Sequence, residues 1–331
     1  MNNLFAVGIT GTGSYLPEKE LTNFDLEKMV DTTDEWITSR TGIKARRISS
    51  ENVAASDLAT RAAQKAMEDA GIVAEDLDLI IVATVTPDMS FPSTSCIVQK
   101  NIGAKNAAAF DIEAACTGFI YAMTIGEQFI KTGFYKNALI IGTEALSKFL
   151  DWEDRNTCVL FGDGAGAVIM EKIDGENGIL SSYLGADGKN GECLTLPGGG
   201  SRTPATHETV DKRLHYIKMD GSDVYKFAVR AMSNSAVRAL ELSNLQIEEV
   251  DFLVPHQANI RIIEAAAKRL KLSMDKVYVN LDNYGNMSAA SVPVALDEAA
   301  RKGCIEKGDN VVLVAFGGGL TWGSIVIRWI K

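Results

Sequence analysis

Short apolar runs alternate along the chain with longer stretches in which apolar residues recur at helical spacing. The runs are continuous and bounded by turn residues, as expected of strands buried on both faces. They cover residues 79–83, 107–112, 139–141, 165–170, 252–254, 311–316 and 324–327. The stretches of helical period cover residues 56–70, 119–131, 224–242, 260–270 and 291–302. This alternation predicts an α/β fold in which helices cover buried sheets.

One segment of the chain recurs without a gap. Residues 66–81 align with residues 239–254, with Ala, Glu, Glu and Asp identical at four positions. The sequence Phe-Gly-Asp-Gly at 161–164 is likewise echoed by Phe-Gly-Gly-Gly at 316–319. Self-similarity of this kind indicates an internal duplication. We therefore predict two similar halves, residues 1–175 and 176–331.

Composition and charge narrow the class of protein. The 331 residues are 46% apolar and 23% charged, which is typical of a folded, enzyme-sized chain. The formal net charge of −10 argues against nucleic acid as a general partner. No apolar run reaches the roughly 18 residues that span a bilayer, and the first residues lack the basic start of a secretory signal. We expect a cytoplasmic protein that binds neither nucleic acid nor membrane.

Glycine-rich and cysteine patterns give no sign of a cofactor or metal. Gly8, Gly11 and Gly13 do not complete a dinucleotide-binding fingerprint, because Leu16 stands at its last position. Such glycines are better explained by turns or close backbone approach. The five cysteines contain no C-x-x-C pair, so neither a zinc ribbon nor a dithiol redox motif is indicated.

Cys116 is a candidate nucleophile. It lies between the predicted strand 107–112 and the predicted helix 119–131. At such a turn the helix dipole and free backbone N–H groups favour thiolate over thiol. The alternative is a small buried hydrophobic residue, and position alone leaves both open.

His256 and Asn286 are candidate partners for this cysteine. His256 follows the predicted strand 252–254, at the carboxyl end where α/β sheets place ligands, although a capping or core histidine is equally consistent. His207 and His215 lie in a polar, irregular stretch and are expected at the surface. Asn286 belongs to a tight turn and on its own is a typical turn residue. Beside an imidazole, its amide would stabilise a developing oxyanion without titrating.

Taken together, these segments resemble a known family. The motifs are those of β-ketoacyl-acyl-carrier-protein synthase III, in the family's order and across essentially the whole chain: Gly11–Pro17, Ala114–Phe119, Val254–Asn259, Gly285–Ser291, Ala315–Gly319 and Thr321–Ser324. The resemblance implies a thiolase-like fold with two duplicated halves in a five-layer α-β-α-β-α sandwich, usually as a homodimer.

The resemblance also implies a reaction and a set of residue roles. Cys116 would accept a short acyl group, acetyl in the simplest case, from acyl-coenzyme A, while His256 and Asn286 would promote decarboxylation of malonyl-acyl-carrier protein. The products would be 3-ketoacyl-carrier protein, coenzyme A and carbon dioxide, without a metal or redox cofactor. The backbone N–H groups of Cys116 and Gly318 would form the oxyanion hole. Coenzyme A would bind at Trp36, Arg155 and Asn259.

A docking surface for the carrier protein is expected on the helix after His256. Arg261 and Lys268 are two helical turns apart and so share one face, beginning close to His256, while the apolar positions pack inward. An ordinary solvated helix face would have the same pattern. The resemblance favours docking and assigns it to Gln257, Ala258, Asn259, Ile260 and Arg261.

Three other functions were weighed. A degradative thiolase needs a second cysteine in its C-terminal glycine motif, and Phe316–Leu320 contains none; Cys304 is expected to be a packing residue. Hydroxymethylglutaryl-coenzyme A synthase needs a glutamate with no evident counterpart here. A non-catalytic acyl-binding subunit would lack the nucleophile or the decarboxylating pair. Two departures from the family pattern, Thr117 and Met287, bear on the shape of the acyl pocket.

Overall fold

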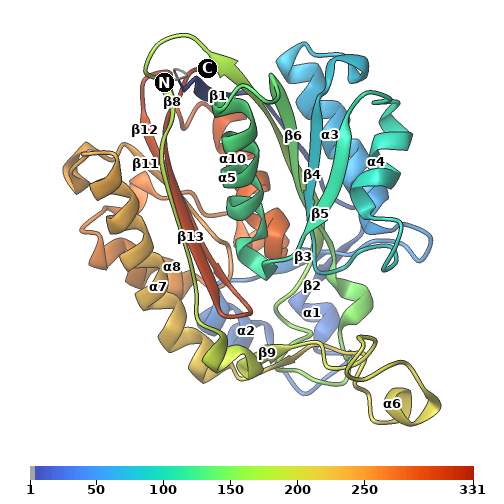
Figure 1. The fold of residues 1–331 in the computed structure, drawn as a ribbon. Helices are drawn as coiled ribbons and strands as arrows, with labels where there is room; N and C mark the ends of the chain where they lie inside the picture. Colours follow the sequence, from blue (N-terminus) through green and yellow to red (C-terminus); the bar gives the residue numbers. More distant parts are fainter. Residues whose placement is uncertain (1–3) are drawn as a thin grey trace.

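Two large β-sheets and three layers of helices dominate the computed structural model, which describes residues 4–331 and also has two small two-stranded sheets (Figure 1). The first sheet has the order β1 (Ala6–Tyr15), β7 (Asp163–Ile173), β6 (Asn137–Ala145), β4 (Leu79–Ala83), β5 (Ala108–Ile112). The second has the order β11 (Phe252–Pro255), β12 (Asn310–Gly317), β13 (Thr321–Arg328), β8 (Gly178–Ala186). Strands β5, β4 and β6 are parallel, as are β11 and β12, and the other pairs are antiparallel.

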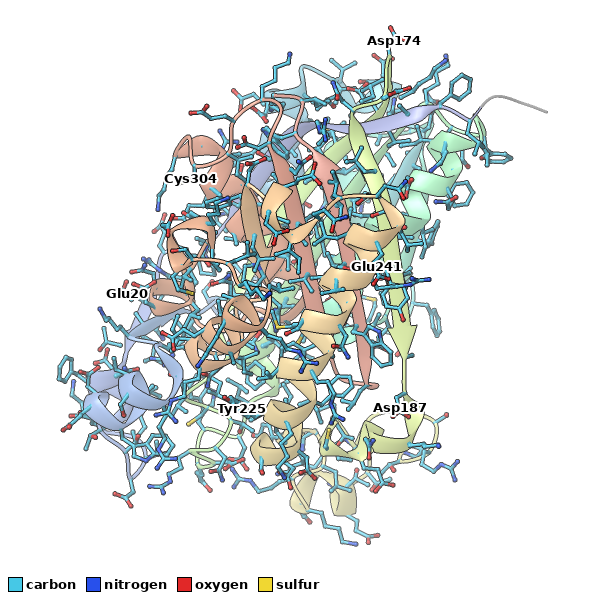
Figure 2. The ribbon with its side chains drawn as sticks, turned by 90° about the vertical axis from the view of Figure 1, so that its left-hand side faces the viewer. Glu20, Asp174, Asp187, Tyr225, Glu241 and Cys304 are labelled. Carbon is cyan, nitrogen blue, oxygen red and sulfur yellow. The ribbon has the colours of Figure 1, made fainter. Side chains whose placement is uncertain are left out.

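The helices form an inner layer and two outer layers. Helices α5 (Gly118–Lys131) and α10 (Ser291–Arg301) lie between the sheets, α3 (Ala55–Ala70) and α4 (Thr94–Ile102) cover the first sheet, and α7 (Gly221–Leu242) and α8 (Ile260–Arg269) cover the second (Figure 1). Figure 2 shows α7 along this outer face, with Tyr225 in its first turns and Glu241 near its end. The smaller elements are β2 (Glu20–Thr22), α1 (Asn23–Leu26), α2 (Asp34–Thr41), β3 (Ala45–Arg47), β9 (Leu194–Thr195), α6 (His207–Asp211), β10 (Lys218–Met219) and α9 (Leu281–Tyr284). The two small sheets are β2-β3 and β9-β10.

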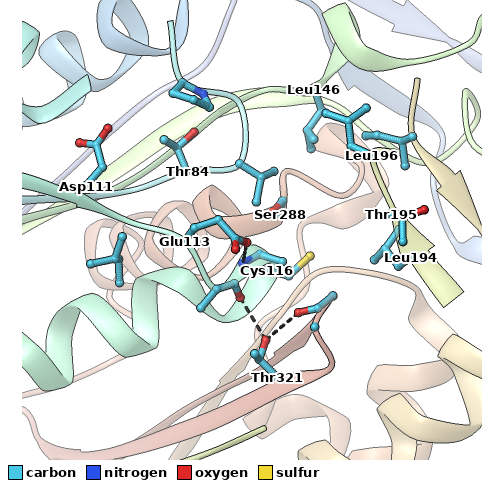
Figure 3. A pocket seen from close by; sticks show the side chains of 18 of the residues that line it. Thr84, Asp111, Glu113, Cys116, Leu146, Leu194, Thr195, Leu196, Ser288 and Thr321 are labelled. Atoms are coloured by element: carbon cyan, nitrogen blue, oxygen red, sulfur yellow. Dashed lines mark hydrogen bonds between the residues drawn. The ribbon is translucent and has the colours of Figure 1, made fainter. Parts of the chain in front are cut away.

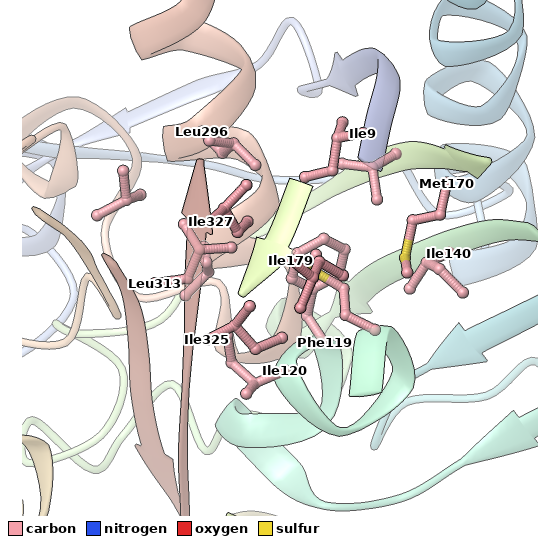
Figure 4. Close-up of a cluster of buried hydrophobic side chains, with 14 of the residues drawn as sticks. Ile9, Phe119, Ile120, Ile140, Met170, Ile179, Leu296, Leu313, Ile325 and Ile327 are labelled. Atoms are coloured by element: carbon pink, nitrogen blue, oxygen red, sulfur yellow. The ribbon is translucent and has the colours of Figure 1, made fainter. Parts of the chain in front are cut away.

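Alternation of side chains along the buried strands builds three apolar cores. In β4, Leu79 and Ile81 face the central helices, whereas Ile80 and Val82 pack under α3. In β12, Leu313 faces the centre and its neighbours face α7 and α8. Successive strand residues point to opposite faces, so continuous apolar runs are what this arrangement requires. The central core joins both sheets to α5 and α10 (Figure 4). This confirms the predicted thiolase-like sandwich.

The two sheets have corresponding strand orders, β1-β7-β6-β4 and β8-β13-β12-β11. Equivalent elements also begin at the same spacing: Leu79 and Phe252 in β4 and β11, Asn137 and Asn310 in β6 and β12. The repeated segment 66–81 contains the end of α3 and β4, and its counterpart contains the end of α7 and β11. The predicted boundary after residue 175 falls between β7 and β8 and remains a prediction.

Every predicted run and helical stretch coincides with a strand or helix, but β1, β8 and α4 were not foreseen. Gly11 and Gly13 stand in β1 and not at turns, because a Cβ on either would lie within 2.4 Å of the Ala66 backbone in α3. Of the two explanations that the sequence offered, turns and close backbone approach, the second therefore holds for both glycines. Within residues 4–331, no helix combines the length and apolar character needed to cross a membrane.

Candidate active site

Cys116 lies in a short 3₁₀ turn, Ala115–Thr117, between β5 and the start of α5. Ala115 before it has φ 46°, a left-handed conformation uncommon for a residue with a side chain. The Ala115 N–H donates to Glu113 Oε1 at 3.0 Å, which supports this turn. Cys116 is 6% exposed and lines a cavity of about 830 Å³ together with Glu113, Leu194 and Gly318 (Figure 3).

The resting thiol is protonated, contrary to the expectation from its place at a helix start. Burial raises the pKa of Cys116 to about 12, and the negative charge of Glu144 adds to this shift. The desolvation of a buried thiolate therefore outweighs the helix dipole in the unliganded protein. A role as a nucleophile would therefore require the thiol to lose its proton when a ligand binds.

His256 follows β11 and is fully buried. Its backbone N–H donates to the Val314 carbonyl at 2.8 Å, and its ring packs edge-on against Phe316 with 5.5 Å between centroids. Burial lowers its pKa to about 3, so the imidazole is neutral at physiological pH. Among residues 4–331, neither ring nitrogen has a hydrogen-bond partner, which leaves both free for a ligand. His207 and His215 line neither of the two cavities at Cys116.

Asn286 is held by its backbone in the turn after α9. Its N–H donates to Leu160 O at 2.9 Å, and its carbonyl accepts from Gly162 N at 3.0 Å. Its side-chain Oδ1 accepts from the Ser288 N–H at 2.8 Å, which fixes the orientation of the amide group. The preceding Gly285 has φ 65°, a conformation that favours glycine.

Cys116, His256 and Asn286 come together at a second cavity of about 170 Å³. The three residues are supplied by the two halves of the chain, and Cys116 and Leu194 line both this cavity and the larger one. A thiol, a neutral imidazole and an amide around one hollow offer a nucleophile and two uncharged oxyanion donors. The sequence predicted this set of residues, and the structure brings them together.

Gly318 lies beside the nucleophile turn, where Thr321 and Thr117 connect the two. The Thr321 hydroxyl lies 3.0 Å from Gly318 O and 3.1 Å from Ala114 O (dashed in Figure 3). It also lies 2.9 Å from the hydroxyl of Thr117, one of the departures from the family pattern. A Cβ on Gly317 would stand 2.6 Å from Cys116 N, so this glycine permits the close approach. Thr321 was missed as a positioning residue because its contacts span the whole chain.

Met287, the other departure, is fully buried against Leu16 and Tyr284 and lines neither cavity at Cys116. It therefore does not shape the pocket directly. Cys304 is exposed and likewise lines neither cavity (Figure 2). The expectation that Cys304 packs in the interior was wrong, because it follows the end of α10 at the surface.

Trp36 and Arg155 lie together at the surface. Trp36 belongs to α2, a helix and not a loop, and the guanidinium carbons of Arg40 and Arg155 lie 5.2 and 5.3 Å from the centroid of its ring. Arg155 Nη1 also donates to Asp31 O at 2.7 Å.

A row of adjoining hollows leads from Trp36 to Cys116. Trp36 lines a hollow of about 370 Å³, and Asn259 and Arg40 line another of about 470 Å³. Gly221 lines both of these and also the small cavity at Cys116. Asn259 caps α8 by accepting from Arg261 N at 2.9 Å. Sequence reasoning missed Arg40 and Gly221, which carry no motif of their own.

The helix predicted to dock the carrier protein is α8. One residue of the predicted docking surface, Gln257, does not belong to it. Gln257 is fully buried, with Nε2 donating to the carbonyls of Pro255 and Tyr278 and Oε1 accepting from Asn280 N. It cannot form part of a surface. Arg261 and Lys268 are exposed, and Arg261 Nη2 donates to Ser39 O at 2.8 Å. Ala258, Asn259 and Ile260 are half-buried. The apolar positions Ile262, Ile263, Ala266 and Leu270 are buried, as predicted.

Comparison with known proteins gives one consistent result. Residues 110–188 match the family model described as 3-oxoacyl-[acyl-carrier-protein] synthase III, and residues 240–329 match its C-terminal model. The chain is 65% identical to β-ketoacyl-[acyl-carrier-protein] synthase III of Caldanaerobacter subterraneus subsp. tengcongensis, over 98% of each chain. It is 62% identical to that of Clostridioides difficile, over 97% of this chain and 98% of the relative. Its structure resembles 3-oxoacyl-[acyl-carrier-protein] synthase III from Aquifex aeolicus, with a TM-score of 0.91 and 49% identity over 98% of this chain and all of that one.

Proposed function

Because the chain belongs to the β-ketoacyl-acyl-carrier-protein synthase III family, acyltransferases that begin fatty-acid synthesis, we propose that it condenses a short acyl-coenzyme A with malonyl-acyl-carrier protein. The starter is most simply acetyl. The observation that carries this proposal is the meeting of Cys116, His256 and Asn286 at one cavity.

In the first half-reaction, Cys116 Sγ attacks the acyl carbonyl carbon. The carbonyl oxygen becomes an oxyanion, which the N–H groups of Cys116 and Gly318 stabilise, and coenzyme A leaves as the acyl-cysteine forms. Support comes from the Thr321 hydroxyl, within hydrogen-bond reach of carbonyl groups in both turns. Fixed donors stabilise a developing charge better than mobile water does.

In the second half-reaction, malonyl-carrier protein loses carbon dioxide and leaves an enolate. His256 and Asn286 donate hydrogen bonds to its oxygen, and the carbanion then attacks the acyl-cysteine and releases Cys116. A neutral imidazole can fill this role, because it still carries one N–H group that donates a hydrogen bond. The resulting 3-ketoacyl group stays on the carrier protein.

The row of hollows from Trp36 to Cys116 supports a binding path for coenzyme A. Trp36 and Arg155 would bind the adenine ring, and Arg40 and Arg261 border the adjoining hollow, where an anionic phosphate would lie. Asn259 would lie near the thiol end. The carrier protein would approach over Arg261 and Lys268 of α8. Both substrates belong to the cytoplasm, and a cytoplasmic location is part of the proposal.

We also propose a homodimer that forms along β5. This strand stands at the edge of the first sheet and is only half-buried, with Ala108 exposed. The segment before α4 carries Met89, 50% exposed, and Phe91, 85% exposed. An uncovered sheet edge next to exposed apolar side chains favours pairing with a second copy. Sedimentation equilibrium measures the mass directly.

The experiment that tests the function follows each half-reaction separately. The purified protein is incubated with labelled acetyl-coenzyme A, digested, and mapped by mass spectrometry; malonyl-carrier protein is then added, and carbon dioxide and 3-ketoacyl-carrier protein are measured. Label on Cys116 followed by turnover supports the proposal. Label on Cys96, Cys158, Cys193 or Cys304 would contradict it, and stable acylation without turnover would leave only a binding role. Competition among acetyl, branched and longer thioesters identifies the starter.

A further inference from the structure

Glu144 is a fully buried carboxyl group for which the mechanism above has no role. It lies in β6, and its Oε2 accepts from the Thr86 hydroxyl at 2.6 Å. The Val85 N–H is 3.2 Å from both carboxyl oxygens, and the Thr84 hydroxyl is 3.3 Å from Oε2. Thr84 and Val85 line the large cavity at Cys116. The carboxyl group is therefore held from one side by the cavity wall.

The turn Ser288–Ala290 packs both against β6, which carries Glu144, and against the turn Ala115–Thr117, which carries the thiol. Gly142, two residues before Glu144 and on the same face of β6, has no side chain and lets the backbone of Ala289 approach; a Cβ there would stand 2.2 Å from Ala289 O. This brings the turn Ser288–Ala290 onto β6. Ser288 and Cys116 line the same cavity, and the Ser288 turn packs directly on the strand of Glu144.

Two features of Ser288 itself point to a role beyond packing. Its φ is 45°, a conformation that a non-glycine residue adopts only at a cost. Its hydroxyl is buried, and among residues 4–331 it makes no hydrogen bond of regular geometry. Ser288 is only 3% exposed, yet it lines the large cavity together with Cys116 (Figure 3). A buried hydroxyl that is not committed to another partner is free to form hydrogen bonds to the thiol and to the carboxylate when substrate binds.

We propose that Ser288 and Glu144 form a proton relay that activates Cys116 for acylation. As Sγ attacks the acyl carbonyl carbon, its proton passes to Ser288 Oγ, and the hydroxyl's own proton passes to the Glu144 carboxylate, which becomes a neutral acid. When the bond between the acyl carbon and coenzyme A breaks, the proton returns by way of Ser288 to the departing thiolate. No proton is gained or lost overall, and the relay rests on the acyl transfer proposed above.

Electrostatics favours Glu144 over His256 as the acceptor. Burial raises the pKa of Glu144 to about 7, whereas it lowers that of His256 to about 3, so the carboxylate is the stronger base of the two. The charge of Glu144 also raises the pKa of Cys116. Movement of the proton to Glu144 removes that charge at the moment the thiolate forms. The buried site therefore carries one negative charge both before and after the proton moves.

The titratable groups around Glu144 are few. The residues that contact it, Thr84, Val85, Thr86, Ser288 and Ala289, carry no charge. Asp163, on the neighbouring strand β7, accepts hydrogen bonds from Ser49 and Ser147 instead. Cys116 is thus the titratable group whose pKa the charge of Glu144 raises, and the charge of Glu113 raises the pKa of the same thiol.

The test measures the rate of Cys116 acylation by acetyl-coenzyme A in a single turnover, and its alkylation by iodoacetamide, both from pH 5 to 9. In the unmodified protein both rates should rise with an inflection near pH 7. Glu144→Gln and Ser288→Ala should lower the acylation rate by roughly 10²-fold and remove the inflection, since a general base commonly contributes 10²–10⁴-fold. Thr86→Val, which removes a donor to the carboxylate, should move the inflection to higher pH without removing it.

Thermal unfolding of each variant shows whether it is folded, and carbon dioxide release from malonyl-carrier protein serves as an internal control that should change less than threefold. Unchanged acylation rates and an unchanged inflection in the folded Glu144→Gln and Ser288→Ala variants would overturn the relay. Loss of decarboxylation to the same degree as acylation would also overturn it, since it would indicate a general structural effect. Failure of the unmodified protein to acylate Cys116 would instead refute the proposed function.

Discussion

The hydroxyl groups of Thr117 and Thr321 lie 2.9 Å apart, one beside the nucleophile and the other at the start of β13. Thr321 also reaches the carbonyl groups of Ala114 and Gly318. A single side chain from the second half of the chain thus holds both turns that carry the proposed oxyanion donors.

Thr321→Val should lower the rate of acyl-cysteine formation by roughly 10-fold, because the two N–H groups lose their fixed spacing. The free energy of unfolding should fall by only about 1 kcal/mol, as for the loss of one hydrogen bond. Rapid-quench acylation and urea unfolding measure the two quantities. Thr321→Ser, which keeps the hydroxyl, is the matched control and should retain most of the rate. Equal rates for the Val and Ser variants would contradict the role of the hydroxyl.

His256→Ala and Asn286→Ala should separate the half-reactions. Both variants should still form acyl-cysteine, but carbon dioxide release from malonyl-carrier protein should fall by roughly 10²- to 10³-fold, since each removes an oxyanion donor. Labelled malonyl-carrier protein measures the release. Decarboxylation at the unmodified rate in both variants would rule out the enolate role.

Trp36→Ala should raise the KM for acetyl-coenzyme A by roughly 10-fold and change the KM for malonyl-carrier protein much less, because a stacked aromatic contact of this kind is worth about 1–2 kcal/mol. Steady-state kinetics with each substrate varied gives both constants. Phe134→Ala removes another exposed aromatic side chain, on the turn after α5, and should change neither. A similar rise in both constants for Trp36→Ala would place the nucleotide elsewhere.

Arg261→Glu should weaken the use of malonyl-carrier protein, most strongly at low salt, while acylation by acetyl-coenzyme A changes little. The chain carries a net charge of −10, so an acidic carrier needs a local basic surface. Lys307→Glu makes the same change of charge before β12, at the opposite end of that strand from Gly317, and is the control. A carrier KM at low salt that matches the control would exclude docking on α8.

His256 should lower the free energy of unfolding in acid, whereas Glu144, whose raised pKa means that the folded protein takes up its proton first, should act in the opposite direction over the same range. The pKa of His256 is about 3 in the folded protein and about 6.5 in the unfolded chain, so the unfolded chain binds the proton first as the pH falls. Between pH 6.5 and 5 this should cost about 2 kcal/mol. The free energy of unfolding of His256→Gln, measured in urea relative to the unmodified protein, should therefore rise as the pH falls across this range, and that of His207→Gln should not. Identical slopes for the unmodified protein and His256→Gln would contradict the burial of a neutral imidazole.

The sequence predicted the strands and helices wherever apolar periodicity was strong, and it located Cys116 and His256 because each follows a strand. It missed β1, where Gly11 and Gly13 break the apolar run in order to admit α3. The family resemblance assigned Gln257 to the docking surface. The type of a side chain does not reveal that its amide will be buried and will donate hydrogen bonds to the carbonyl groups of Pro255 and Tyr278.

The electrostatics of the site also escaped prediction. The thiol of Cys116 was expected to ionise at the helix start, but that expectation left out the desolvation that comes only with the packed interior. Ser288 and Glu144 are far apart in the chain and share no motif, so their proximity depends on the bare backbone at Gly142.

The equivalence of the two halves has an electrical consequence. The inner helices α5 and α10 begin at equivalent points of the duplication, one directly after the turn that holds Cys116 and the other directly after the turn that holds Ser288. The amino ends of both helices, each with a partial positive charge, therefore converge on the same pocket. A protein of net negative charge thus surrounds its reacting atoms with a positive potential made from peptide groups alone. That potential acts on the anions that arise in passing, first the oxyanion and then the enolate.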